Sequence, residues 1–217
     1  KTAPETDENI KLQQESTLRL LQLANGKLSE SLTPIPDLTE HEQEYFRHQF
    51  QAIYEATQPS AIPIKARRWG VVMNSQRQAT DHLSAVSNME IKSAAICTAV
   101  DGYGVITKFS KYQFRPDQDV LLYCELDNIS ADAVQDGFET QLQGNYEIVD
   151  RNGARVADQM LQVEREVCKN RRRDYFIVYR IYMPMQIAPG SYQLRLTIED
   201  MKAHKFGQST IDFQIVK

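Results

Sequence analysis

The segment FETQLQGNYEI, residues 138–148, alternates between two kinds of side chain. One parity is apolar or small and includes Phe138, Leu142, Tyr146 and Ile148, while glutamate, glutamine and asparagine fill most of the other. Successive side chains of a β-strand point to opposite faces of a sheet. This period of two therefore predicts a strand with one face on a core and the other in water.

Similar alternation returns around Leu194 and Phe213, and β-branched and aromatic residues dominate beyond residue 90. Turn chemistry at Asp150–Gly153 and Ala188–Gly190 separates some of these runs. The pattern predicts an antiparallel, immunoglobulin-like β-sandwich of about eight strands over residues 91–217. We expect the strands near residues 92–100, 103–109, 119–127, 137–149, 154–166, 174–183, 191–200 and 207–216.

Residues 1–90 have helical periodicity instead, and we expect a polar tail through Glu8 followed by about three helices. Asn25-Gly26 interrupts the first helix, and Pro34 ends it. The second helix opens with a capping box at Thr39 and Glu42 and carries an aromatic stripe. The third spans about residues 66–89, with Trp69 and Leu83 among its apolar positions.

One predicted strand, near residues 174–183, has apolar residues on both faces, because Phe176, Val178 and Tyr182 lie opposite the core parity. The helices show apolar stripes but no evident core of their own. We therefore expect the N-terminal helices to pack on this outer face, which gives an α+β fold in one integrated unit.

The composition of the chain excludes several classes of protein. Among its 217 residues, 25 basic and 29 acidic side chains give a net charge of −4, so we expect no nucleic-acid partner. No apolar run approaches the roughly 20 residues that span a bilayer, so no transmembrane segment is predicted. The sequence opens on Lys1 rather than methionine, which leaves room for a removed signal peptide or anchor.

The residue types that carry chemistry form no known motif. Histidines stand at 41, 48, 82 and 204; His41 and His48 can share one helical face, but no third ligand is local, so we expect solvated side chains. No Gly-x-Ser-x-Gly elbow or phosphate-binding loop is present. The sequence thus predicts no enzyme, no catalytic residue, no metal and no cofactor. Four carboxylates near strand ends are interpreted as polar strand positions and turn starters: Glu125, Asp127, Glu199 and Asp200.

Three segments together carry a resemblance: AICTAVDGYGVITKF (95–109), CKNRRRDYFIVYRIYMP (168–184) and PGSYQLRLTIEDMKAHKFGQSTIDFQI (189–215). They are similar to a family of uncharacterised planctomycete proteins whose members tend to follow an export or membrane-anchor region. The resemblance implies an extracytoplasmic location, in the periplasm or cell envelope, with anchoring through a preceding segment as one option. It implies no activity.

The same resemblance bears on the cysteines. Relatives have cysteines at the positions of Cys97 and Cys168, but a different residue at the position of Cys124. In DVLLYCELDN, Cys124 shares the apolar parity and is interpreted as a small core residue. A disulfide between Cys97 and Cys168 is therefore our hypothesis.

The most concentrated charge lies at 169–173, where four of five residues are basic. Arg171, Arg172 and Arg173 are the candidate interaction residues for an acidic protein or polysaccharide. The alternative is that they pair with neighbouring acidic residues, which are Glu164, Glu166 and Asp174.

These observations favour a non-enzymatic, exported structural or protein-interaction module that binds an unknown protein or polysaccharide of the cell envelope. The alternative is a carbohydrate-binding accessory domain, for which Tyr103, Tyr112 and Tyr182 are the candidate aromatic platform. A homodimer is a further option. It would form through the leucines of the first helical region, which are Leu18, Leu21, Leu28 and Leu32.

Overall fold

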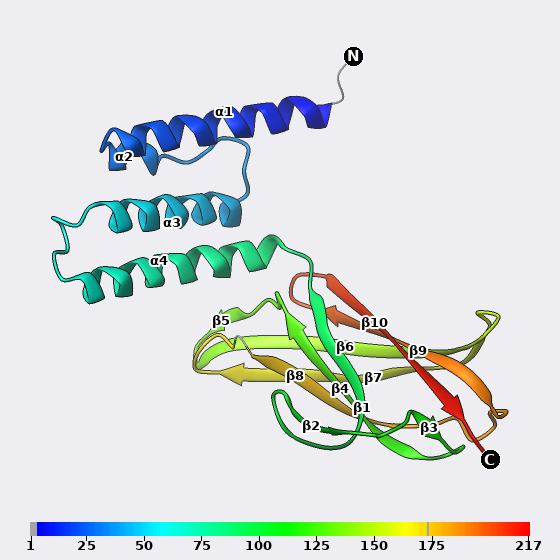
Figure 1. Cartoon of the computed structure of the whole chain (residues 1–217). Coiled ribbons are helices and arrows are strands. Elements are labelled where there is room, and N and C mark those ends of the chain that lie inside the picture. Colours follow the sequence, from blue (N-terminus) through cyan, green and yellow to red (C-terminus); the bar gives the residue numbers. More distant parts are fainter. Residues whose placement is uncertain (1–3, 173) are drawn as a thin grey trace. The chain divides into compact units, whose positions relative to one another are not determined.

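The computed structural model describes residues 4–172 and 174–217. These residues form four α-helices and ten β-strands, so the chain belongs to the α+β class (Figure 1). It divides between Ser87 and Asn88 into two compact units, one helical and one built from strands. None of the helices described here has the length and apolar character needed to cross a bilayer.

The helical unit contains α1 (Pro4–Ala24), α2 (Leu28–Ser31), α3 (Glu40–Thr57) and α4 (Lys65–Val86). The predicted break after the first helix is confirmed, since Gly26 has a φ of 75°, a value that glycine adopts readily. The predicted capping box is also confirmed. The Thr39 hydroxyl accepts from the Glu42 N–H, and the Glu42 carboxylate accepts from the Thr39 N–H.

The expectation of a loose tail through Glu8 was wrong, because α1 already begins at Pro4. Proline suits the first position of a helix, where its missing N–H would have no partner. Arg19 of α1 is buried and donates to the carbonyl oxygens of Thr33 and Pro34, at 3.0 and 3.4 Å. This arginine fastens α1 to the connection that leads into α3.

The helical unit has a core of its own, which the sequence pattern did not reveal. Leu23, Ile35 and Phe50 are buried in it, whereas Leu18 and Leu21 of the predicted stripe are exposed. The expectation that helices cover the strands concerns the placement of the two units and stays a prediction. The partly buried residues around this core are Leu12, Leu28, Leu32, Leu38, Phe46, Ile53 and Tyr54.

The strand unit contains two sheets. The first has the order β2-β1-β4-β8, formed by Val105–Lys108, Glu90–Gly102, Asp119–Asp127 and Tyr175–Tyr182. The second has the order β3-β10-β9-β6, formed by Gln113–Phe114, Lys205–Ile215, Gly190–Asp200 and Gly137–Asp150. Both β5 (Asp132–Val134) and β7 (Arg155–Cys168) pair with β6. The pairing of β3 with β10 is parallel, and the other pairings given are antiparallel.

All eight predicted strands are present, with ends that differ by at most two residues. The sequence pattern missed β3 and β5, which have two and three residues. Such short strands cannot display an alternation. The predicted faces of β6 are also confirmed, because Leu142 and Ile148 are fully buried.

The apolar faces of the two sheets share one core. The first sheet contributes Ile96, Leu122 and Ile181, and the second contributes Leu142 and Leu196. Inside this core Gly144 of β6 has no space for a side chain. An added Cβ would lie 3.0 Å from both Leu161 Cδ1 and Tyr179 Oη.

We predict that Gly144→Ala lowers the free energy of unfolding by about 1–3 kcal/mol, because the extra methyl group overpacks the core. Gly102→Ala is the matched control, since no heavy atom lies within 4 Å of its added Cβ. Denaturant unfolding of both variants measures the difference. Equal stabilities for the two would show that the sheets do not pack as closely at Gly144 as described.

Glu139 departs from the alternation, because it has the polar parity of β6 and yet is only 6% exposed. Its carboxylate accepts from Lys202 Nζ at 2.7 Å and lies 2.5 Å from an Arg165 guanidinium nitrogen. The hydrogen bond from Lys202, followed by that from Arg165, holds the pKa of Glu139 below its usual range. One carboxylate thus links β6 to β7 and to the turn after β9.

The outer face of the first sheet carries a small apolar cluster of its own. Cys97 and Tyr123 are fully buried in it, and Phe176 packs against them. The Tyr123 hydroxyl accepts from the Gly104 N–H and donates to Glu125, both at 2.8 Å. The β1–β2 turn is thereby held against this face, part of which is covered by residues of the strand unit itself.

Burial raises the pKa of Tyr123 to about 12, from an ordinary value of 10. The neutral Tyr123 hydroxyl therefore makes its full contribution to the free energy of unfolding below pH 10. This contribution is lost as the pH rises toward 12. We predict that Tyr123→Phe lowers the free energy of unfolding at pH 7 by about 1 kcal/mol, because two hydrogen bonds are lost. The same substitution should make the decrease of stability between pH 10 and 12 less steep. Thermal unfolding from pH 7 to 12 measures both effects, with exposed Tyr182→Phe as control. Identical alkaline slopes for wild type and Tyr123→Phe would contradict the prediction.

Candidate functional sites

Two helices of the helical unit bring together a cluster of histidine and glutamate side chains. Positions 41, 44 and 48 are separated by three and four residues, so a helix places them on one face of α3. His82 comes from α4, which packs alongside α3. We call His41, Glu44, His48 and His82 the α3–α4 cluster.

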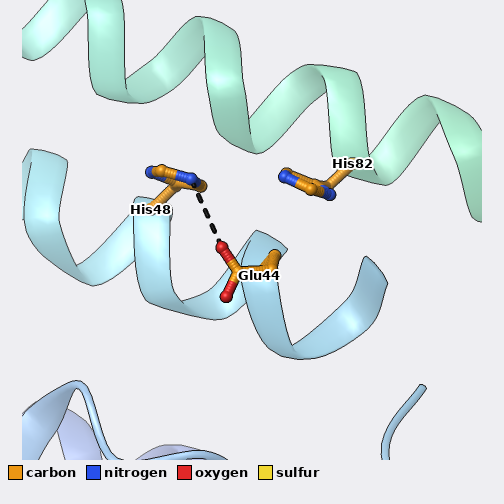
Figure 2. Close-up of side chains that lie close together, drawn as sticks. All are labelled: Glu44, His48 and His82. Atoms are coloured by element: carbon orange, nitrogen blue, oxygen red, sulfur yellow. Dashed lines mark ion pairs between the residues drawn. The ribbon is translucent and has the colours of Figure 1, made fainter. Parts of the chain in front are cut away.

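The side chains of Glu44, His48 and His82 point toward one another (Figure 2). One potential ligand atom from each of Glu44, His48 and His82 lies within 4.8 Å of the other two. The Nδ1 atoms of His41 and His82 are 3.1 Å apart, and His48 Nε2 is 3.6 Å from a Glu44 carboxylate oxygen. Such a group of nitrogen and oxygen donors is what a transition metal binds.

Arg47 also reaches this cluster. Its guanidinium donates to both carboxylate oxygens of Glu44, with a shortest distance of 2.5 Å, and lies 2.8 Å from His48 Nε2. Arginine can only donate, so the Nε2 atom of His48 is the acceptor in this contact. The lone pair of His48 Nε2 and the carboxylate of Glu44 are thus turned toward the same cation.

Electrostatics supports this assignment of protons. Burial, and then the Arg47 charge, lowers the pKa of His48, which is 8% exposed. The hydrogen bond from Arg47 lowers the pKa of Glu44. At neutral pH the cluster therefore holds a neutral His48 imidazole and an ionised Glu44.

The structure corrects our interpretation of these histidines. We expected solvated side chains without a third ligand, and His41 is indeed exposed, but α4 brings His82 to the cluster and His48 is buried. No pattern within α3 can reveal a partner 34 residues farther along the chain. His204 agrees with our interpretation, since its side chain is 82% exposed in the turn before β10, where it contacts Glu199.

A second candidate site is a groove of about 850 Å³ on the outer face of the second sheet. Hydrogen-bonding side chains line it, and several already pair across strands. Gln113 donates to Gln214 at 3.1 Å, and Gln193 donates to Asp212 at 3.0 Å. The β6–β7 turn contributes Arg151, which donates to a serine of β9.

The basic segment at 169–173 is largely engaged with its neighbours. Arg172 donates to Glu166 at 2.9 Å and to the Asp174 carbonyl oxygen at 3.1 Å, and its guanidinium lies over the Tyr175 ring. The Arg171 guanidinium lies over the ring of Phe138. Arg173 falls outside the described residues. The arrangement of Arg172 agrees with the alternative of local pairing.

The hypothetical disulfide between Cys97 and Cys168 is not formed, because all three cysteines are free thiols. Cys97 is buried on the outer face of β1, whereas Cys168 ends β7 in the other sheet. Cys124 is a core residue, as we interpreted it. Burial is the main cause that raises the pKa of each thiol, so all three stay protonated at neutral pH.

The three tyrosines of the predicted aromatic platform do not meet. Tyr112 packs against the core and lines the groove, and its hydroxyl oxygen accepts from the Ile96 N–H. Tyr103 packs on Phe176 near one end of β8, and Tyr182 lies at the other end of that strand. Six residues of strand separate positions 176 and 182, which is about 20 Å.

The carboxylates near strand ends have structural roles. Asp200 is buried and accepts from the backbone N–H groups of Ser130 and Lys202. Asp127 accepts from the Asn128 N–H and pairs with Lys92. The interpretation of Asp127 and Asp200 as turn residues is confirmed.

Comparison with known proteins gives no family. No family model and no curated protein matches the chain. A Pseudomonas fluorescens alkylpurine DNA glycosylase, AlkC, is similar over 82% of this chain and 50% of its own, with 8% identity and a TM-score of 0.35. A Niemann-Pick type C2 protein from the Japanese carpenter ant is similar over 60% of this chain and 94% of its own, with 7% identity and a TM-score of 0.37.

A Bacteroides uniformis β-glucuronidase has an equally weak structural similarity to this chain. It covers 58% of this chain and 14% of the enzyme, with 12% identity and a TM-score of 0.37. The chain spans half of the glycosylase and a small part of the glucuronidase. At such identities and TM-scores these likenesses carry no argument about function.

Proposed function

We propose that this protein is a non-enzymatic protein-interaction module that binds its partner along the free edge of β7. The observation that carries this function is the length and character of that edge. Strand β7 has 14 residues and pairs, among the described strands, with β6 alone. Its exposed side chains include Val156, Met160, Val163 and Val167.

An unpaired strand edge presents backbone N–H and C=O groups that can pair with a strand of another protein. Soluble proteins usually guard such edges by keeping them short or charged. Strand β7 has charged residues, including Arg165 and Glu166, but Met160 is 64% exposed and Val163 is 42% exposed. Apolar side chains beside free backbone groups suit strand addition by a protein partner, because both contacts then form together.

The proposed fold of the strand unit is immunoglobulin-like, and its topology supports this proposal. In the immunoglobulin fold the strands A, B and E are neighbours in one sheet, and C, F and G are neighbours in the other. The orders β1-β4-β8 and β6-β9-β10 correspond to these two sets. We further propose that the protein is exported and works in the cell envelope, on the likeness of residues 91–217 to the planctomycete family.

The groove on the second sheet favours the alternative of a carbohydrate-binding accessory domain. Its glutamine, aspartate and arginine side chains can exchange hydrogen bonds with sugar hydroxyl groups. Of the three tyrosines that we expected as a stacking platform, only Tyr112 lines the groove, whereas Tyr103 and Tyr182 lie at the first sheet. We rank this function second for that reason.

We predict that a photo-crosslinking amino acid at Met160 forms one discrete protein adduct in cells of the native organism. Val163→Asp should reduce that adduct at least fivefold, because it places a charge in the proposed interface. The same crosslinker at Gln214, in the groove, is the matched control. Intact-protein electrophoresis and mass spectrometry measure the yield and identity of the adducts.

An adduct from position 214 but not from position 160 would contradict the β7 proposal and favour the groove. No adduct from either position, or an adduct from 160 that Val163→Asp leaves unchanged, would also contradict it. Circular dichroism of each variant shows whether the strand unit is intact.

A further inference from the structure

We infer that Glu44, His48 and His82 form a binding site for a divalent transition metal ion, with His41 orienting His82. This inference goes beyond the proposed function, because it concerns the helical unit and involves no strand. It follows from the donor atoms, their separations and the position of Arg47.

The donor set of the α3–α4 cluster selects the class of metal. Two imidazoles and one carboxylate are typical ligands of zinc and of other late first-row ions. Calcium and magnesium prefer oxygen ligands, of which this cluster offers only the Glu44 carboxylate. We therefore take Zn²⁺ as the probe.

The separations require only a modest adjustment. Zinc bonds of 2.0–2.1 Å in a tetrahedral site place ligand atoms roughly 3.3 Å apart. The candidate ligand atoms already lie within 4.8 Å of one another, and His48 Nε2 is 3.6 Å from Glu44. Glu44 is one-third exposed, so its side chain can change rotamer without disturbing the helices.

His41 has a different part in this site. Its Nδ1 atom lies 3.1 Å from Nδ1 of His82. A histidine that binds metal through one ring nitrogen usually has a hydrogen-bond partner on the other, which fixes the ring and its tautomer. His41 provides that partner, which makes it a positioning residue.

Arg47 and a metal ion would compete for the same two ligands. The guanidinium satisfies the Glu44 carboxylate and the lone pair of His48 Nε2, as a cation does. The Arg47 side chain is 42% exposed, so it can turn toward solvent when a metal binds. Removal of Arg47 should therefore strengthen metal binding, whereas a purely structural ion-pair network predicts no zinc affinity at all.

The test is a competition titration of the full chain with Zn²⁺ and a chromophoric chelator. We expect one bound zinc per chain, and binding at least about tenfold weaker in His82→Gln and in Glu44→Gln. Arg47→Gln should bind zinc at least threefold more tightly than the wild type. His204→Gln is the matched control, because His204 also contacts a glutamate but has no second histidine beside it, and it should bind as the wild type does.

Thermal unfolding provides a second readout, since a ligand that binds only the folded state raises the Tm. Zn²⁺ should raise the Tm of the wild type and of His204→Gln, and Mg²⁺ should not. Circular dichroism confirms that each variant retains its helices. The inference is overturned if the wild type binds no zinc, if His82→Gln and Glu44→Gln titrate as the wild type does, or if Arg47→Gln binds zinc more weakly.

Discussion

The strand unit depends on the burial of two apolar sheet faces against each other. Strands β4 and β8 supply one face, and β6, β9 and β10 supply the other. Because side chains alternate along a strand, the residues of the other parity lie on the face directed away from the shared core. These are mainly polar in β6, β9 and β10, whereas β4 and β8 contribute the apolar residues of the Tyr123 cluster there. The groove and the Tyr123 cluster lie on these outward faces, so the same alternation that forms the core also positions the surfaces that can bind a partner.

Alternation made the strands predictable from the sequence, while the packing faces of the helices were not. In β6 the period of two allows only one choice of which residues face the core, and the burial of Leu142 and Ile148 confirms that choice. In α1, Leu18 and Leu21 were the expected apolar stripe, yet both are exposed and Leu23 is buried instead. Which side of such a helix packs is decided by its neighbours in space, and the local sequence does not contain them.

The same distinction explains why the α3–α4 cluster was missed. The spacing of His41 and His48 was visible, but the contribution of His82 depends on the pairing of α3 with α4. Glu44 was hidden among the four acidic residues of the segment 40–55. Apolar residues at strand β7 were likewise visible in the sequence, whereas its position at a sheet edge appears only in the topology.

Two units with separate cores allow two independent kinds of site in one chain. The helical unit combines a buried histidine with an ionised glutamate and an arginine, which is a site for a cation. The strand unit has the open edge of β7 and a polar groove, which are the surfaces that we propose for a larger partner. Neither site uses the residues that the sequence suggested first, because Arg172 is paired with Glu166 and the cysteines are separate.

Hydrogen exchange of the full chain, followed by mass spectrometry, tests the central role of the shared core most directly. Strands with a partner on both sides and buried apolar faces should open only with the whole unit. We expect the slowest exchange in β4, β6 and β9, and faster exchange in the edge strands β2 and β7. Exchange in β4, β6 and β9 as fast as in β2 and β7 would contradict this expectation.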